Sequence, residues 1–98
     1  MSQSIALSFN DFTFSPVTRA NQPWFRSSEL ARALGYARED KVARLYQRNA
    51  EEFTENMTQV VEIVDNKVRI FSLRGCHLIA MFARTPVAKQ FRRWVLDV

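Results

Sequence analysis

The feature that most constrains the fold is a β-hairpin pattern placed between two stretches of helical periodicity. Residues 58–64 and 67–71 are rich in β-branched and apolar residues, and the pair Asp65-Asn66 between them is typical of a tight turn. On both sides of this pattern, apolar residues recur at the three- and four-residue spacing of amphipathic helices. The sequence therefore predicts an α+β fold of small antiparallel strands and hairpins packed with about four short helices.

The first part of the chain predicts further short strands. Apolar residues alternate with polar ones on both sides of the turn pair Asn10-Asp11, at Ile5, Leu7, Phe9, Phe12 and Phe14. Pro16 should interrupt the second of these strands or lie at its edge, because proline has no N–H group to donate to a strand ladder. Residues 21–23 predict another turn, and Trp24-Phe25 either a short strand or an anchor after it.

The segment after these strands has features of the first half of a helix-turn-helix. Ser27 or Ser28 is suited to the N-cap of a helix. Ala31 supplies the small residue at which two helices approach, and Gly35 supplies the turn. Short matches to this motif arise often by chance.

A second helix is predicted over residues 38–48, with Val42 and Leu45 on its buried face. These two residues fall one position later than the helix-turn-helix spacing requires. Two interpretations follow: either the turn is one residue longer, or the pair is an ordinary helical corner. Asp40 and Arg44 have the i, i+4 spacing of a surface ion pair.

Residues 72–98 predict two more helices. Ser72 is the expected N-cap of a helix over about 73–83, and Thr85 that of a last helix with Pro86 at its first position. The residues expected to face the core are Leu73, His77, Leu78, Met81 and Phe82 in the third helix, and Val87, Phe91, Trp94, Val95 and Val98 in the fourth.

Charge is distributed unevenly along this basic chain. The 98 residues carry 14 Lys and Arg against 10 Asp and Glu, so the net charge is +4. Residues 51–65 have a net charge of −5, whereas residues 26–48, 67–74 and 84–98 each have a net charge of +3. Such an asymmetry can produce one positive face, which permits a nucleic-acid partner.

The candidate nucleic-acid-binding residues are basic side chains on three of the predicted elements: Arg38, Lys41, Arg44, Arg48, Lys67, Arg92 and Arg93. On the second helix they would reach phosphates or base edges in a major groove. If the hairpin is a wing, Lys67 and also Arg69 would lie near phosphates. The alternatives are solvated helix faces, and a hairpin that only covers the core.

Several classes of function lack support in the sequence. A single cysteine, Cys76, and a single histidine, His77, offer too few ligands for a metal site, and both are expected to be buried structural residues. With two glycines in the chain and no paired-carboxylate pattern, we expect neither a cofactor nor an enzyme. The sequence has no apolar run of membrane-spanning length and no secretory signal, so we expect a cytoplasmic protein without a membrane partner.

Two segments resemble the signatures of the BRO family N-terminal domain. Residues 23–25 with residues 30–36 (PWF and LARALGY) are similar to its opening signature, and residues 83–95 (ARTPVAKQFRRWV) to its closing one. We therefore expect residues 5–98 to form one such domain after a flexible N-terminus at residues 1–4. In the family the last helix normally continues beyond the tryptophan, so the end at Val98 suggests a domain excerpt or a shortened product.

The resemblance implies a DNA-binding module of a phage or prophage antirepressor-type regulator, related to baculovirus BRO proteins. The alternative function is a protein-interaction module that binds a repressor without contacting DNA. A salt-titrated DNA-binding assay separates the two, because phosphate contacts make affinity fall steeply with salt concentration.

Overall fold

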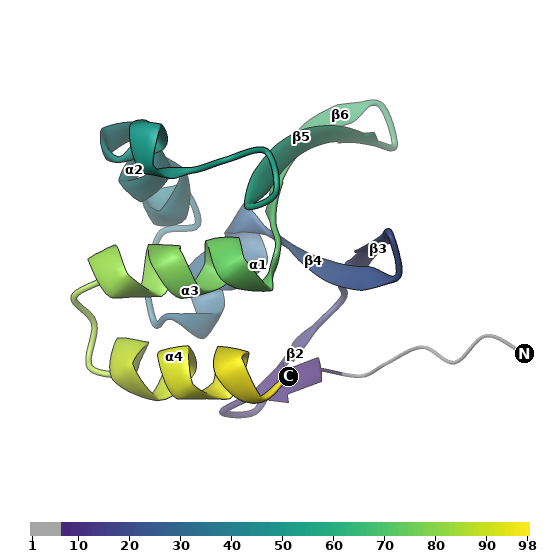
Figure 1. Cartoon of the computed structure of the whole chain (residues 1–98). Helices are drawn as coiled ribbons and strands as arrows, with labels where there is room; N and C mark the ends of the chain where they lie inside the picture. Colours follow the sequence, from purple (N-terminus) through teal and green to yellow (C-terminus); the bar gives the residue numbers. More distant parts are fainter. Residues whose placement is uncertain (1–6) are drawn as a thin grey trace, which may run out of the picture.

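The computed structural model describes residues 7–98, which form an α+β domain (Figure 1). The expected flexible N-terminus, residues 1–4, and Ile5 lie outside the described residues. The strands are β1 (Leu7–Phe9), β2 (Phe12–Phe14), β3 (Val17–Arg19), β4 (Gln22–Arg26), β5 (Thr58–Ile63) and β6 (Asn66–Phe71). The helices are α1 (Ser27–Ala33), α2 (Lys41–Arg48), the 3₁₀-helix η1 (Ala50–Glu52), α3 (Leu73–Phe82) and α4 (Ala88–Asp97). The predicted fold class is confirmed.

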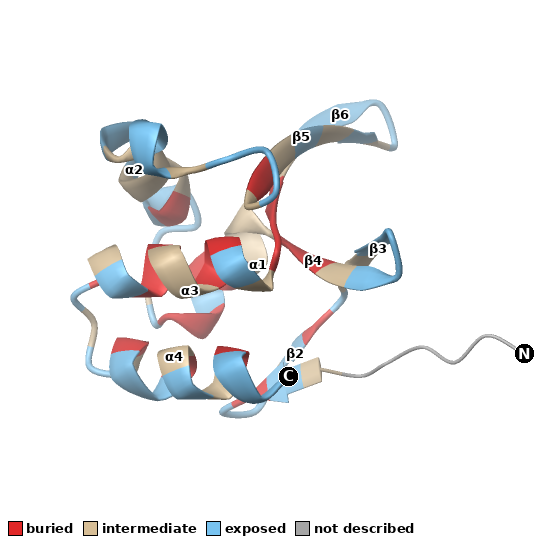
Figure 2. Cartoon of the chain, viewed as in Figure 1, coloured by how far each residue is buried: buried red, intermediate tan, exposed pale blue. Residues whose placement is uncertain are grey.

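Strand β4 joins the two hairpins of the larger sheet, whose order is β3-β4-β6-β5 with all neighbours antiparallel. Residues 22–24 pair with β3, whereas Phe25 and Arg26 pair with β6. The hairpins therefore diverge from β4, as Figure 1 shows, and their tips are exposed (Figure 2). Pro23 lies in the half of β4 that has a partner on one side only, a position that tolerates proline.

Each hairpin turns through two consecutive residues with positive φ: Asn10-Asp11, Ala20-Asn21 and Val64-Asp65. This is the type I′ geometry, whose twist matches that of the flanking strands. The predicted turn at Asn10-Asp11 is confirmed. The other two turns begin one residue earlier than expected from the sequence, and β3 was not anticipated.

Hydrogen bonds at the base of the β5–β6 hairpin determine which two residues form the turn at its tip. The Ser72 N–H donates to the Met57 carbonyl (3.0 Å), and the Thr58 hydroxyl donates to the Ile70 carbonyl (2.9 Å). These bonds hold Thr58 opposite Phe71, and counting along both strands then leaves Val64 in the turn. A β-branched residue with φ near 47° is unusual, which is why the sequence favoured Asp65-Asn66.

Helix α1 ends in the way that Gly35 predicts. Gly35 has φ near 87°, and its N–H donates to the Arg32 carbonyl (3.0 Å). The Tyr36 N–H donates to the Ala31 carbonyl (3.0 Å), which completes a Schellman motif. The prediction for the start of α1 is wrong: Arg26 is the N-cap residue, without a side-chain cap, and both serines lie in the first turn.

Helix α2 begins at Lys41 rather than Arg38, because residues 38–40 remain in the connection from α1. Residues 34–40 separate the two helices, a longer turn than the three or four residues of a helix-turn-helix. This length explains why Val42 and Leu45 fall late against the motif. Val42 is fully buried and holds α2 against the core.

Helix α3 has the predicted cap and a different buried face. The Ser72 hydroxyl accepts from the Gly75 N–H (3.2 Å). The buried side of the helix is made by Gly75, Cys76, Ile79 and Ala80, whereas Met81 is exposed, contrary to prediction. The backbone just before β5 explains this face: a Cβ atom at position 75 would overlap the Met57 carbonyl oxygen, so only glycine permits the close approach.

Helix α4 packs on α3 and closes an aromatic cluster with the N-terminal strands. Phe91 is fully buried, and its ring meets Phe9 edge-to-face at 5.2 Å between centroids. Trp94 is half-buried and stacks on Phe14 at 5.6 Å. Thr85 is not the N-cap, because α4 begins at Ala88.

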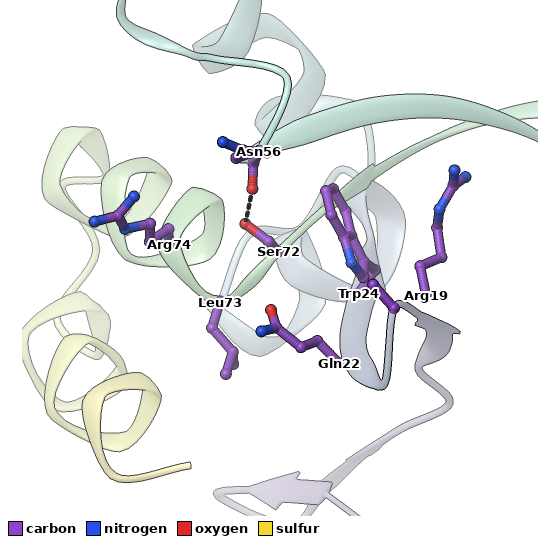
Figure 3. Close-up of a pocket in the computed structure, with 8 residues that line it drawn as sticks. Arg19, Gln22, Trp24, Asn56, Ser72, Leu73 and Arg74 are labelled. Carbon is purple, nitrogen blue, oxygen red and sulfur yellow. Dashed lines mark hydrogen bonds between the residues drawn. The ribbon is translucent and has the colours of Figure 1, made fainter.

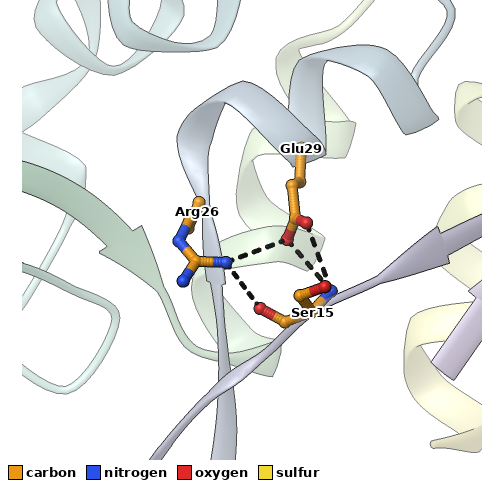
Figure 4. A network of polar contacts seen from close by, with 3 residues as sticks. All are labelled: Ser15, Arg26 and Glu29. Carbon is orange, nitrogen blue, oxygen red and sulfur yellow. Dashed lines mark hydrogen bonds and ion pairs between the residues drawn. The ribbon is translucent and has the colours of Figure 1, made fainter. Parts of the chain in front are cut away.

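A polar network holds the segment after β2 beside α1 (Figure 4). The Ser15 N–H donates to both carboxylate oxygens of Glu29 (3.3 and 3.2 Å), and Arg26 donates to the Ser15 carbonyl (2.8 Å). Burial raises the pKa of Glu29, while the Ser15 N–H and the neighbouring arginines oppose that rise. The network anchors the N-terminal strands to the rest of the fold.

Candidate nucleic-acid interface

The exposed face of α2 carries the basic stripe expected from the sequence. Lys41, Arg44 and Arg48 are all exposed. Arg44 Nε lies 3.3 Å from Asp40 Oδ2, and Arg38 contacts the same oxygen at 2.9 Å, so this one carboxylate partly neutralises both arginines. Lys41 and Arg48 form no ion pair within residues 7–98 and keep their full charge for a ligand.

These two cations line a groove between α2 and the end of α3 together with a third, Arg84. The groove has a volume of about 640 Å³, and Tyr36, Leu45, Asn49 and Phe82 complete its lining. A shallower depression beside it is lined by Arg44, Gln47 and Arg48. Among the described residues, no Asp or Glu lines either depression. We call Lys41, Arg48 and Arg84 the α2 groove cations.

Arg84 was absent from the sequence-based set of candidates. It directly follows α3 and Ala83, in a segment that the sequence marks by the net charge of residues 84–98 and by the signature at residues 83–95. Neither signal singles out Arg84. Nothing in a single sequence shows that the end of α3 reaches α2, because that proximity depends on tertiary packing. The residue becomes a candidate only when the fold is known.

The β5–β6 hairpin does not form a basic wing. The Arg69 guanidinium lies 4.1 Å from the centroid of the Tyr46 ring and donates to the Thr58 hydroxyl (3.0 Å), so it joins the hairpin to α2. Lys67 is exposed but stands opposite Glu62 in the strand register. The hairpin therefore presents little net positive charge to a phosphate backbone.

The remaining candidates lie on α4, on the other side of α3 from α2 (Figure 1). Arg92 is half-buried and donates to the Ala80 carbonyl of α3 (3.3 Å), while Arg93 is exposed. The seven predicted residues therefore do not converge on one surface. Four of them cluster on or beside α2, and the hairpin and α4 carry the others.

Cys76 and His77 differ from each other in their surroundings. Cys76 is fully buried, and burial raises the pKa of its thiol well above the usual range, which leaves it protonated. His77 is half-buried and lines a groove between α3 and α4, so the expectation of a buried core imidazole is wrong. Residues 7–98 contain no group of three or more His, Cys, Asp or Glu placed to hold a metal ion.

Of the helices in residues 7–98, none has the length and apolar character needed to cross a membrane. No curated protein and no solved structure matches the chain. A family described as "BRO family, N-terminal domain" (Bro-N) matches residues 13–98, which include the helices, the β5–β6 hairpin and the α2 groove cations. The chain therefore belongs to the BRO family, as the segments at residues 23–36 and 83–95 suggest.

Proposed function

We propose that this Bro-N domain binds duplex DNA through α2 and the end of α3, as part of an antirepressor-type regulator. The observation that carries the proposal is the convergence of the α2 groove cations on one groove without an acidic neighbour in its lining. Arginine and lysine side chains bind the phosphate oxygens of DNA, and those contacts position a protein on the duplex.

The adjoining depression supplies groups for base contacts. Gln47 is exposed on α2 and lines this depression together with Arg44 and Arg48. A glutamine amide can pair with an adenine edge, and an arginine with a guanine edge, in the major groove. With its side chains an α-helix is about 10–12 Å across, which fits the width of about 12 Å of that groove.

The test is a fluorescence-anisotropy titration of a labelled duplex at several salt concentrations. Each phosphate contact adds about 0.9 to the slope of log affinity against log salt. We expect the double variant Arg48→Gln/Arg84→Gln to weaken binding and to flatten this slope by up to about 2. The matched control is Arg93→Gln/Lys67→Gln, which removes the same charge from α4 and the hairpin and should retain most of the slope.

Absence of wild-type binding at low salt would refute the DNA-binding proposal. One observation favours the alternative, a repressor-binding module: the groove between α3 and α4 is mostly apolar, and Leu96 at its edge is 71% exposed. Exposed apolar surface of this kind favours a protein partner. In that case a repressor would bind independently of salt, and the groove variants above would leave its binding unchanged.

A further inference from the structure

Among residues 7–98, no strand lies beside the outer edge of β5. Strand β5 is the last in the order β3-β4-β6-β5, and its hairpin projects from the body of the domain (Figure 1). An exposed edge is a template for another strand unless charged residues, proline or a bulge protect it. The six residues of β5 (TQVVEI) include no proline and no bulge, and Glu62 is their one charged side chain.

The strand register shows which backbone groups point out of this edge. Ile63 and Asn66 flank the two-residue turn, so they form a hydrogen-bonded pair, and such pairs recur at every second residue. The N–H and C=O groups of Val60 and Glu62 therefore point away from β6. On that outer side, neither residue has a backbone hydrogen-bond partner within residues 7–98. These four groups can pair with an added strand.

The start of β5 is fixed beside the pocket around Trp24 (Figure 3). The Ser72 hydroxyl donates to the Asn56 carbonyl (2.8 Å), two residues before the strand begins. The Thr58 N–H, on the outer side, donates to the Thr54 carbonyl (3.2 Å), which leaves the Thr58 carbonyl as the first free group of the edge. A partner would therefore meet an edge whose first residue is already ordered.

The surroundings of this edge are acidic. Residues 51–65 have a net charge of −5, and none of their five carboxylates forms an ion pair within residues 7–98. Glu62 lies on the strand, and Glu55 and Asp65 lie beyond its two ends, all three exposed. Lys67, opposite Glu62 on β6, balances one of these charges. A basic partner complements the others, whereas a second copy of the chain would bring the same acids together.

We propose that β5 binds an extended, basic segment of a protein partner, which adds to the sheet as a further strand. Main-chain hydrogen bonds to Val60 and Glu62 hold the segment, and a lysine or arginine opposite Glu62 gives selectivity. Val60 is 50% exposed, and a β-branched residue of the partner would cover it. The proposal does not depend on DNA binding, because β5 contributes no residue to the groove beside α2.

The probe is the capped peptide acetyl-KTVTVK-amide, whose first lysine and first valine can stand opposite Glu62 and Val60 in an antiparallel pair. Amide hydrogen exchange of the ¹⁵N-labelled wild-type protein is measured by NMR. At saturating peptide, exchange of the Val60 and Glu62 amides should slow by about tenfold or more. The Val61 amide already pairs with β6, so it is the internal control and should change little.

A second peptide and three variants separate backbone pairing from charge. The peptide acetyl-ETVTVE-amide has the same core and should bind more weakly by about tenfold or more. Val60→Pro removes an outward N–H without removing a bond to β6 and should weaken binding of KTVTVK by a similar factor. Val60→Thr keeps that N–H and should bind like wild type. Glu62→Lys should reverse the preference between the two peptides. Circular dichroism checks that each variant is folded.

The proposal is overturned if millimolar KTVTVK protects neither amide, if the two peptides bind wild type equally well, or if folded Val60→Pro binds like wild type. Protection of the Val60 and Glu62 amides that rises with protein concentration alone would identify a second copy as the occupant. That result would also overturn the assignment to a basic partner.

Discussion

Helices α2 and α4 have similar basic stripes in the sequence and different environments in the structure. In α2, Val42 alone is buried, and the basic side chains of the helix face solvent. In α4, Ala88, Phe91 and Val95 are buried, and Arg92 donates to the backbone of α3. Helix α4 therefore serves mainly to close the core, whereas α2 contributes little to the core and keeps its charges available.

The difference between the helices shows what a stripe of basic residues does not specify. Spacing at i, i+3 and i+7 predicts that side chains share a face, but not which element that face meets. Arg84 joins Lys41 and Arg48 because α3 ends beside α2. The following experiments test the contrast between a structural α4 and a binding α2, from the largest expected effect to the smallest.

The largest effect should come from Phe91→Ala in α4. The ring is fully buried among Phe9, Phe14 and Trp94, so its removal should lower the free energy of unfolding by about 3–5 kcal/mol. Urea denaturation followed by circular dichroism measures this change, with Arg93→Ala as the control on the same helix. Trp94→Ala should cost less because that ring is half-buried. A loss no larger than that of the Arg93 control would mean that α4 does not close the core.

Charge reversal should separate the two helices in DNA binding. Arg48→Glu removes a cation that lines the groove and adds a repulsive carboxylate, so we expect duplex affinity to fall by about tenfold or more. Arg93→Glu makes the same change in net charge on α4 and should weaken binding much less. Anisotropy titrations at one fixed salt concentration give both values. Equal losses would indicate that binding follows net charge alone.

A smaller effect is expected for Arg92→Ala, which removes the hydrogen bond from α4 to the Ala80 carbonyl. The free energy of unfolding should fall by about 0.5–1.5 kcal/mol, the usual contribution of one such bond, and duplex affinity should hardly change. Denaturation and anisotropy on the same preparation provide the two readouts. A large loss of affinity with unchanged stability would place Arg92 in the binding surface and contradict its structural role.

The smallest effect concerns Glu29, which helps to hold the segment after β2 beside α1. Because burial raises its pKa in the folded state, the native protein keeps the proton to higher pH than the unfolded chain does. Its ionisation therefore lowers stability as the pH rises through the folded-state pKa, above the usual 4.5. The free energy of unfolding of the wild type should therefore fall slightly between pH 4 and neutral pH when it is compared with that of Glu29→Gln, which cannot ionise at this position. The opposite slope, measured by denaturation at each pH, would show that the ion pair with Arg26 outweighs burial.

Local signals made much of the fold predictable. Gly35, the Ser72 cap and the Asn10-Asp11 turn each depend on neighbours within a few residues, and all three are confirmed. The tip at Val64 was not predictable, because hydrogen bonds at the base of the hairpin determine it. The exposure of Met81 likewise depends on which side of α3 meets the Met57 backbone, a tertiary contact.

The binding residues follow the same rule. The stripe on α2 and the Asp40–Arg44 pair follow from helical spacing, and the structure confirms the pair at 3.3 Å. The groove that includes Arg84 and the pocket around Trp24 are each lined by residues that are distant in the sequence. The spacing of residues within one helix or strand therefore cannot predict them. What sequence analysis missed was contact between elements rather than the character of any one element.

The approach of α3 to the Met57 carbonyl has a genetic consequence. Every missense change of a glycine codon adds a Cβ atom, and at position 75 that atom would occupy the space of a backbone oxygen. The obstructing atom belongs to the backbone and cannot move aside as a flexible side chain could. Replacement of Gly75 by alanine should therefore destabilise the fold almost as much as replacement by a large residue. In a library of all single-codon changes selected for folding, codon 75 should still encode glycine, while its exposed neighbour Arg74 should vary freely.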